Sequence, residues 1–280
     1  MKAFIVGVGL IGGSFALSLK NKGICSEVVG YDISADNAAE AVARGLIDRA
    51  VDMDEGVAGS DLIVLAAPVD KIPMMATKIL NKVTSGQVVM DMGSTKGELC
   101  EVTSMHRNRG RLVATHPMWG TEYHGPQAAV ADAFTGRKVV LCDIERSDRD
   151  AVELVEGIYT RIGMPIVYMA PDEHDLHAAY VSHISHITSF ALALTVLEKE
   201  REAQHIFDLA GGGFESTVRL AKSPASMWIP ILMQNKYNVL DVLREHIHQL
   251  QIMRLMIERD DEEGLREAMQ RANTIQKILG

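Results

Sequence analysis

The chain opens on a short apolar run followed at once by closely spaced glycines, and no other feature constrains its fold as strongly. The run from Ala3 to Val6 is typical of a buried parallel strand. Gly7, Gly9 and Gly12 follow in G-x-G-x-x-G spacing, and the apolar pattern then continues into a helix. Such glycines permit a tight turn, a close approach of the backbone to a pyrophosphate, and packing of the helix on its strand. The sequence therefore predicts a dinucleotide site at a helix N-terminus, where free N–H groups favour an anion.

A carboxylate at the end of the second predicted strand supports this interpretation. The strand covers residues 27–32 and ends at Asp32, 25 residues after Gly7. At this distance a carboxylate typically meets the ribose hydroxyls, and it would repel the extra phosphate of NADP, so we predict NAD. The alternative is a glycine turn followed by a surface aspartate. The other residues predicted to bind the cofactor lie beside the glycines or at the end of a later strand: Leu10, Ile11, Ala67 and Pro68.

Composition narrows the class of protein. A formal net charge of -9 argues against nucleic acid as a partner, because phosphate contacts need a clustered positive surface. An anionic substrate must then be held by a local cationic pocket. The three cysteines lack metal-ligand spacing and fit a reducing cytoplasm. We expect no signal peptide, since a strand begins at the N-terminus, and no membrane span, since the apolar run 190–197 is too short.

Strand and helix signals alternate through the first 170 residues. After the first two strands, the predicted strands cover residues 61–69, 87–91, 112–115, 138–141 and 165–169. Helical patterns lie between them, as at 36–44 and 148–162. This alternation is typical of a doubly wound α/β fold. We therefore predict a Rossmann-type, mainly parallel sheet that forms an NAD-binding domain over residues 1–170.

From Pro171 onward, strand signals vanish and helical periodicity continues to the end of the sequence. One helix is predicted from Pro171 to Glu198, and a longer amphipathic helix from Asn235 to Arg259. We therefore predict an all-α C-terminal domain over residues 171–280 that binds substrate and dimerises. The apolar face of the longer helix favours a homodimer. An ordinary core helix within one chain is the alternative.

Two polar segments follow predicted strands, where ligands bind in open parallel sheets. Ser94 comes just after the predicted strand 87–91, and His116 directly follows the predicted strand 112–115 and precedes a proline. An imidazole has an ordinary pKa of about 6.5 and can exchange a proton near neutrality. His116 is therefore the candidate catalytic base. The alternative is a histidine that only ties down its loop through hydrogen bonds.

The 10 histidines also raise the question of a metal site. Several of them follow Pro171 on one predicted helix, and two of these, His183 and His186, are spaced i, i+3. The chain has neither an H-E-x-x-H motif nor paired Glu-x-x-His motifs, so we predict no metal. Four other histidines are expected in solvent-exposed or capping roles: His174, His177, His246 and His248.

Taken in order along the chain, these segments resemble the prephenate dehydrogenase family of tyrosine biosynthesis, which includes arogenate and cyclohexadienyl dehydrogenases. The matching pieces are GVGLIGGS, DMGSTKG, HPMWGTE, HDLHAAYVSHISH and VRLAKS followed by MW. They extend over nearly the whole chain, and HPxxGTE together with SHxxH is the specific part. One departure is Met118-Trp119, which is bulkier than the Ile-Ala pair frequent in the family, so Trp119 is a candidate for reshaping the pocket.

The resemblance implies an NAD-dependent oxidative decarboxylation of prephenate to 4-hydroxyphenylpyruvate. His116 matches the family's catalytic histidine, which accepts the proton of the ring hydroxyl, and Ser94 matches a serine that hydrogen-bonds the same hydroxyl. Arg219 matches an arginine that binds a substrate carboxylate. Further residues predicted on the substrate side are His186, Ser182, Thr121, Glu122 and Lys96. A solvated role is the alternative for the lysine.

Three other functions compete with this one. An arogenate or cyclohexadienyl dehydrogenase uses the same chemistry, and no single residue decides between the two substrates. A 3-hydroxyacid dehydrogenase would carry a lysine base on the helix between the domains, but that helix has no lysine before Lys199. A non-catalytic NAD-sensing regulator would have lost site residues, whereas Ser94, His116 and Arg219 are all present.

Overall fold

A computed structural model describes residues 1–202 and 205–279 of the chain. The chain divides into two compact units, Met1–Asn235 and Lys236–Gly280, which we call the sheet unit and the tail unit. The helices from Pro171 to Asn235 belong to the same compact unit as the sheet. The predicted division into domains at residue 170 stays a prediction.

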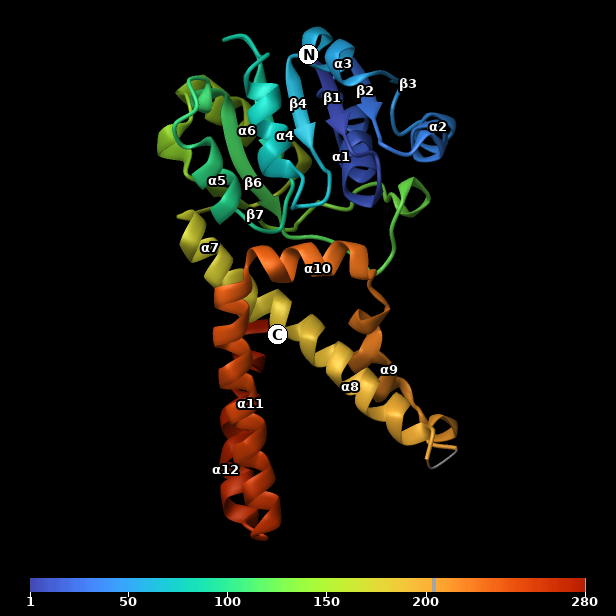
Figure 1. Cartoon of the computed structure of the whole chain (residues 1–280), viewed down its shortest axis with the longest axis vertical. Coiled ribbons are helices and arrows are strands. Elements are labelled where there is room, and N and C mark those ends of the chain that lie inside the picture. The colour runs from blue at the N-terminus through green and yellow to red at the C-terminus, as the bar shows by residue number, and fades with distance from the viewer. Residues whose placement is uncertain (203–204, 280) are drawn as a thin grey trace. The chain divides into compact units, whose positions relative to one another are not determined.

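The described elements are eight strands, thirteen α-helices, five short 3-10 helices and one π-helical turn, and Figure 1 shows their arrangement within each unit. The strands are β1 Lys2–Val6, β2 Glu27–Tyr31, β3 Arg49–Ala50, β4 Leu62–Leu65, β5 Val88–Asp91, β6 Leu112–Pro117, β7 Val139–Cys142 and β8 Ile166–Met169. The helices of the sheet unit are α1 Leu10–Asn21, α2 Ala35–Ala43, α3 Met53–Gly59, α4 Ile72–Leu80, α5 Gly97–Thr103, α6 Arg149–Ile162, α7 Pro171–Ala178, α8 Ile184–Glu200, α9 Gly212–Val218 and α10 Ala225–Gln234. Those of the tail unit are α11 Lys236–Glu258, α12 Glu262–Asn273 and α13 Gln276–Leu279.

The sheet has the strand order β3-β2-β1-β4-β5-β6-β7-β8. All neighbouring strands pair in parallel except β6 and β7, which pair antiparallel with His116 opposite Val140. The first six strands therefore have the order of a dinucleotide-binding Rossmann sheet. This confirms the predicted fold class, a mainly parallel doubly wound sheet followed by helices. The carboxyl ends of β1, β4, β5 and β6 lie at one edge.

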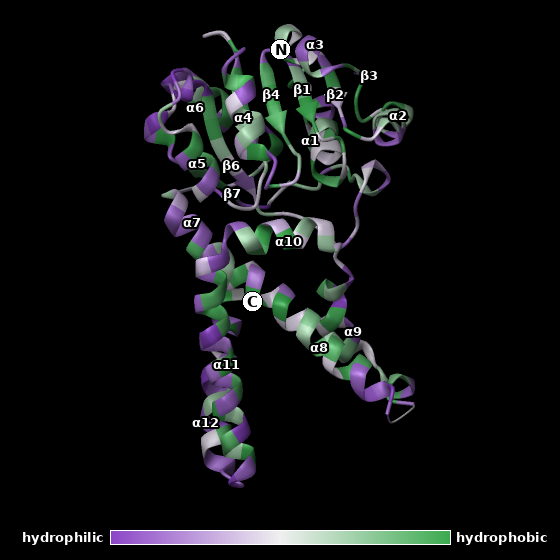
Figure 2. Cartoon of the chain, in the orientation of Figure 1, coloured by the Kyte–Doolittle hydropathy of each residue, from purple (hydrophilic) through white to green (hydrophobic). Residues whose placement is uncertain are grey.

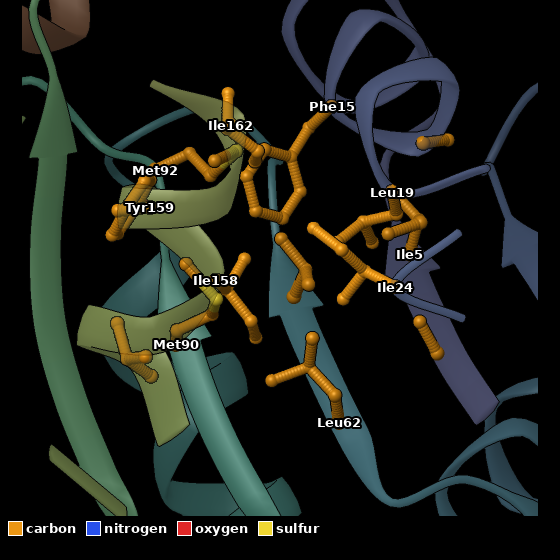
Figure 3. Close-up of a cluster of buried hydrophobic side chains, with 14 of the residues drawn as sticks. Ile5, Phe15, Leu19, Ile24, Leu62, Met90, Met92, Ile158, Tyr159 and Ile162 are labelled. Atoms are coloured by element: carbon orange, nitrogen blue, oxygen red, sulfur yellow. The ribbon is translucent and has the colours of Figure 1, made fainter. Parts of the chain in front are cut away.

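Alternate residues of the inner strands enter one of two apolar cores. Phe15 and Leu19 of α1 and Tyr159 of α6 pack on one face against Ile5 and Leu62 (Figure 3). On the other face, residues of α3, α4 and α5 cover the intervening strand residues, such as Phe4 and Ile63. Burial on both faces explains why inner strands such as β1 and β4 are continuous apolar runs, which Figure 2 draws in the hydrophobic colours.

The predicted helix from Pro171 to Glu198 is interrupted. A π-helical turn, Ala179–His183, separates α7 from α8, and the helical stretch as a whole runs to Glu200. By length and hydropathy, Pro171–Glu200 could cross a bilayer, and 11% of its most apolar 18-residue window is buried. One such helix is weak evidence for a membrane span, because length and composition are all that this comparison uses. The run 190–197 is thus part of a much longer apolar helix than the sequence run by itself indicates.

The tail unit consists of α11 followed by α12 and α13, and α11 contacts α12. Several apolar residues of α11 are exposed on the single chain. They are Leu240, Ile247, Leu250, Met253 and Ile257. Apolar side chains that are exposed together on a helix commonly mark an interaction site, because their burial against another surface is favourable. This surface is therefore suited to a protein partner.

Candidate active site

The glycine loop between β1 and α1 leaves room for a ligand at one position and is tightly packed at the others. Gly7 has a φ of +92°, and a Cβ there would lie 2.6 Å from the carbonyl oxygen of Ala66. A Cβ on Gly12 would lie 1.9 Å from the carbonyl oxygen of Gly7. At Gly9, by contrast, a Cβ would meet nothing within 4 Å. The loop thus has the close packing that the fingerprint needs, and open space at the N-terminus of α1, where a pyrophosphate would bind.

Asp32 lies directly beside this loop. One carboxylate oxygen accepts a hydrogen bond from the Val8 N–H at 3.1 Å, and the other accepts from the Ser34 N–H at 3.0 Å. The Asn37 side chain also donates to it, at 3.4 Å. These bonds fix the carboxylate at the end of β2, which is the position expected for a ribose ligand. Four other predicted cofactor residues lie at the same edge: Leu10 and Ile11 open α1, and Ala67 and Pro68 follow β4.

His116 lies near the end of β6 and is half-buried. Its Nδ1 is 2.8 Å from Nε2 of His174, and the two rings meet edge to face. Burial, and next the neighbouring His174, hold the pKa of His116 well below the usual value of 6.5. The imidazole is therefore neutral at neutral pH, as a proton acceptor must be.

His174 departs from its predicted role, because it is buried and not solvent-exposed. Its Nδ1 lies 2.8 Å from the Asp175 carboxylate, which also accepts hydrogen bonds at 2.8 Å from the Lys96 and Gly97 N–H groups. Burial raises the pKa of Asp175, but the bonds from His174 and the two N–H groups outweigh it and lower the pKa. Sequence reasoning missed both residues. The one signal was that His174 and the apolar Ala178 share a helix face at i, i+4.

Lys96, which was predicted on the substrate side, is enclosed by the protein. Its side chain is 0% exposed and forms an ion pair with Asp91, whose side chain is equally buried. The ammonium also donates to the Thr115 carbonyl oxygen at 2.7 Å. Asp91 in turn accepts from the Thr115 N–H at 2.9 Å and from the Gly93 N–H at 2.8 Å. This buried pair therefore fixes the loop that carries Ser94, which is half-buried, against the strand that carries His116.

The π turn and the helix after it carry two more predicted residues, Ser182 and His186. His186 is partly buried and stacks on Trp228 of α10, with ring centroids 3.5 Å apart. Burial lowers the pKa of His186, and its Nδ1 lies 3.2 Å from the Ser182 carbonyl oxygen. Ser182 itself is half-buried. His183 is buried, contacts Asn235 at 3.2 Å and meets the same Trp228 ring edge to face, with ring centroids 5.8 Å apart.

Arg219 and Glu122, both predicted on the substrate side, form an ion pair of 2.7 Å. The arginine side chain is 51% exposed and the glutamate 13%. A hydrogen bond from its own backbone N–H, together with the contact to Arg219, lowers the pKa of Glu122. The buried Ser189 hydroxyl holds the turn around Arg219, since it donates to Thr217 O and accepts from Ala221 N. Sequence reasoning missed this serine.

The remaining predicted residues lie in the loop after β6. The Thr121 hydroxyl accepts a hydrogen bond from the Tyr123 N–H at 3.3 Å, which shapes the loop next to Glu122. The Trp119 ring packs edge-on against Phe134, with centroids 5.4 Å apart, and joins the core under α1. The bulk of this indole is thus anchored in the core.

Comparisons with known proteins agree with this arrangement. Residues 15–168 match the nucleotide-binding domain of prephenate dehydrogenase, and residues 170–271 match its dimerization domain. The chain belongs to the prephenate dehydrogenase family. Among its relatives, the prephenate dehydrogenase of Bacillus subtilis (strain 168) is 31% identical over 93% of this chain and 71% of that protein. The cyclohexadienyl dehydrogenase of Zymomonas mobilis is 28% identical over 94% of this chain and 90% of that protein.

A solved family structure is also similar over the full length. The prephenate dehydrogenase from A. aeolicus, crystallised with hydroxyphenyl propionate and NAD+, superimposes with a TM-score of 0.92. It shares 31% sequence identity, and the match covers 100% of this chain and 98% of that one. The fold, including the helices after the sheet, is therefore that of the prephenate dehydrogenase family.

Proposed function

We propose that this chain is an NAD-dependent dehydrogenase that converts prephenate to 4-hydroxyphenylpyruvate with loss of carbon dioxide. The observation that carries the proposal is the placement of three segments at one edge of the sheet. The glycine loop follows β1, Ser94 follows β5, and His116 lies near the end of β6, and these strands are parallel and connected through β4. Membership in the prephenate dehydrogenase family supports this assignment.

The residues of the glycine loop fit NAD. Open space at Gly9 and the free N–H groups of α1 would receive the pyrophosphate, and no acidic residue lies in the first turn of α1 to oppose it. The Asp32 carboxylate would bind the ribose hydroxyls and repel the additional phosphate of NADP. When bound, NAD supplies the acceptor for the hydride that leaves the carbinol carbon of the substrate.

His116 would act as the base and then as the acid. The substrate hydroxyl gives its proton to the imidazole while the hydroxyl carbon becomes a carbonyl, and Ser94 hydrogen-bonds the same oxygen. Loss of the ring carboxylate as carbon dioxide makes the ring aromatic and places negative charge on this oxygen. The oxygen then needs a proton again, so His116 can return the one it took. A lowered pKa of His116 favours this return, because the imidazolium gives up its proton readily.

The substrate carries two carboxylates, which need charge-assisted hydrogen bonds when they leave water. Arg219 is the exposed cation next to this site, and its planar fork suits a carboxylate. We place His186 and Ser182 at the substrate side chain, and Thr121 and Glu122 at the entrance. In this scheme Glu122 holds the guanidinium until the substrate carboxylate competes for it.

We further propose a homodimer formed through the helical residues. The match to a dimerization domain supports it, as do the exposed apolar residues of α11. Such a partner would cover surface that the single chain leaves in water. A reducing cytoplasm remains the compartment that the free cysteines fit.

The direct test follows NADH absorbance with the purified chain. Four mixtures combine prephenate or arogenate with NAD or NADP. We expect the highest kcat/KM with prephenate and NAD. A higher value with arogenate would make the chain an arogenate dehydrogenase with the same chemistry, and no reduction in any mixture would refute the proposed activity.

A further inference from the structure

A series of three hydrogen-bonded groups leads from the backbone of α5 to the candidate base. Asp175 contacts His174, and His174 contacts His116, each through one pair of atoms 2.8 Å apart. His174 is buried and lies on α7, whereas His116 is on β6, so the tertiary fold brings them together. The direction of each hydrogen bond follows from which groups are able to donate.

The Asp175 carboxylate is an acceptor at both oxygens. It accepts hydrogen bonds from the N–H groups of Lys96 and Gly97, at the N-terminus of α5. The N-cap residue of α5 makes no capping hydrogen bond with its own side chain. An ionised carboxylate has no proton to donate. The proton between Asp175 and His174 therefore belongs to Nδ1 of His174. Asn235 also donates to the Asp175 carbonyl oxygen at 2.6 Å, which holds this residue in place.

The direction of the hydrogen bond between His174 and His116 follows from that of the bond between Asp175 and His174. A neutral imidazole carries one proton, so with its proton on Nδ1, His174 has only a lone pair on Nε2. The proton in the contact between His174 and His116 must then lie on Nδ1 of His116. The Nε2 atom of His116 is left with a lone pair. Of the two tautomers of this histidine, this is the one that can accept a proton at Nε2.

We propose that His174 and Asp175 are positioning residues that keep the proton of His116 on Nδ1 and thereby leave Nε2 free as the base. The inference rests on the proposed function for the reaction, but the tautomer itself is a property of the protein alone. A carboxylate in the place of His174 would also accept the Nδ1 proton, but it would bring a negative charge to His116, whereas His174 held by Asp175 accepts the proton as a neutral group. The arrangement thus specifies one tautomer before substrate arrives.

Two variants of the full-length chain separate this role from simple packing. His174→Phe keeps a flat ring but offers no acceptor, so His116 can move its proton to Nε2. His174→Gln offers its Oε1 as an acceptor for the Nδ1 proton. We expect His174→Phe to lower kcat about 100-fold or more, with KM for prephenate within about 3-fold, and His174→Gln to retain most of kcat. His177→Phe, on the exposed side of the same helix, is the matched control and should leave kcat unchanged.

The second readout is the ¹⁵N NMR spectrum of histidine-labelled protein at pH 8, without substrate, with His116 assigned from the spectrum of His116→Asn. We expect the His116 proton on Nδ1 in the wild type and in His174→Gln, and a shift toward Nε2 in His174→Phe. A wild-type proton on Nε2 would overturn the proposal even if no variant folds. Equal kcat losses in the Phe and Gln variants would also overturn it. A wild type that reduces NAD with neither substrate would refute the proposed function, while the spectrum would still decide the tautomer.

Discussion

Two cations were predicted from the sequence to meet the substrate, and the structure gives them opposite environments. Lys96 is completely buried in an ion pair with Asp91, under the edge of the sheet. Arg219 is half exposed in an ion pair with Glu122, on a turn after α9. A buried charge must keep its partner, because leaving the other charge unpaired in the interior costs several kcal/mol. An exposed pair is worth little and can exchange its partner for a ligand carboxylate. The comparison therefore separates a structural cation from one that can bind.

The largest expected effect is on stability. Replacing Lys96 with Met leaves the Asp91 carboxylate without its ammonium in the interior, and we expect the free energy of unfolding to fall by about 3–5 kcal/mol. Chemical denaturation followed by circular dichroism measures it. Arg219→Ala is the exposed counterpart and should change the unfolding free energy by less than about 1 kcal/mol. Equal losses in the two variants would erase the distinction between the pairs.

The next largest effect is on the turnover of a variant that lacks the candidate base, His116. We expect His116→Asn to lower kcat about 100-fold or more while NAD affinity stays near the wild-type value, because the ring would act on the substrate proton and not on the dinucleotide. Steady-state kinetics gives kcat, and calorimetric titration gives the affinity for NAD. Turnover close to wild type in this variant would remove His116 from the role of base.

Replacing Arg219, the exposed cation, should mainly weaken substrate binding. We expect Arg219→Ala to raise the KM for prephenate about 10- to 100-fold with a smaller change in kcat, since a charge-assisted pair with a carboxylate is lost. Glu122→Gln is the matched control: it removes the partner charge but keeps the arginine, so KM should change less than about 3-fold. If Glu122→Gln raised KM as much as Arg219→Ala, the ion pair itself, and not the free guanidinium, would be the functional unit.

The smallest expected effect is on the pH dependence of kcat, which should be flat near neutral pH. Since burial lowers the pKa of His116 below 6.5, the imidazole stays unprotonated as the pH falls from 8 to 6.5. We therefore expect kcat to be nearly constant over that interval and to decrease only at more acidic pH. A kcat profile measured at saturating prephenate and NAD tests this. A midpoint at or above pH 6.5 would contradict the buried environment described for the base.

Much of the sheet could be predicted because its signals are local. The apolar run before Gly7, the glycine spacing and the acid at Asp32 all lie within one strand–helix–strand segment, and the structure places them together. Helix details were harder. The helix predicted from Pro171 to Glu198 contains a π turn at Ala179–His183, and nothing in the local apolar pattern distinguishes a π turn from an α turn. The antiparallel pairing of β6 with β7 likewise depends on long-range contacts.

By itself, the sequence determined the fold class, the cofactor loop and the residue types of the site, because these follow from short-range spacing and from the family resemblance. Only the tertiary structure decided which charged and polar groups are buried and which groups they pair with. It placed Lys96 in the interior and Arg219 outside, and it set His174 against His116 across 58 positions of sequence. The physical reason is that a side chain's charge state and hydrogen-bond direction depend on desolvation and on neighbours in space, neither of which is encoded by its position along the chain.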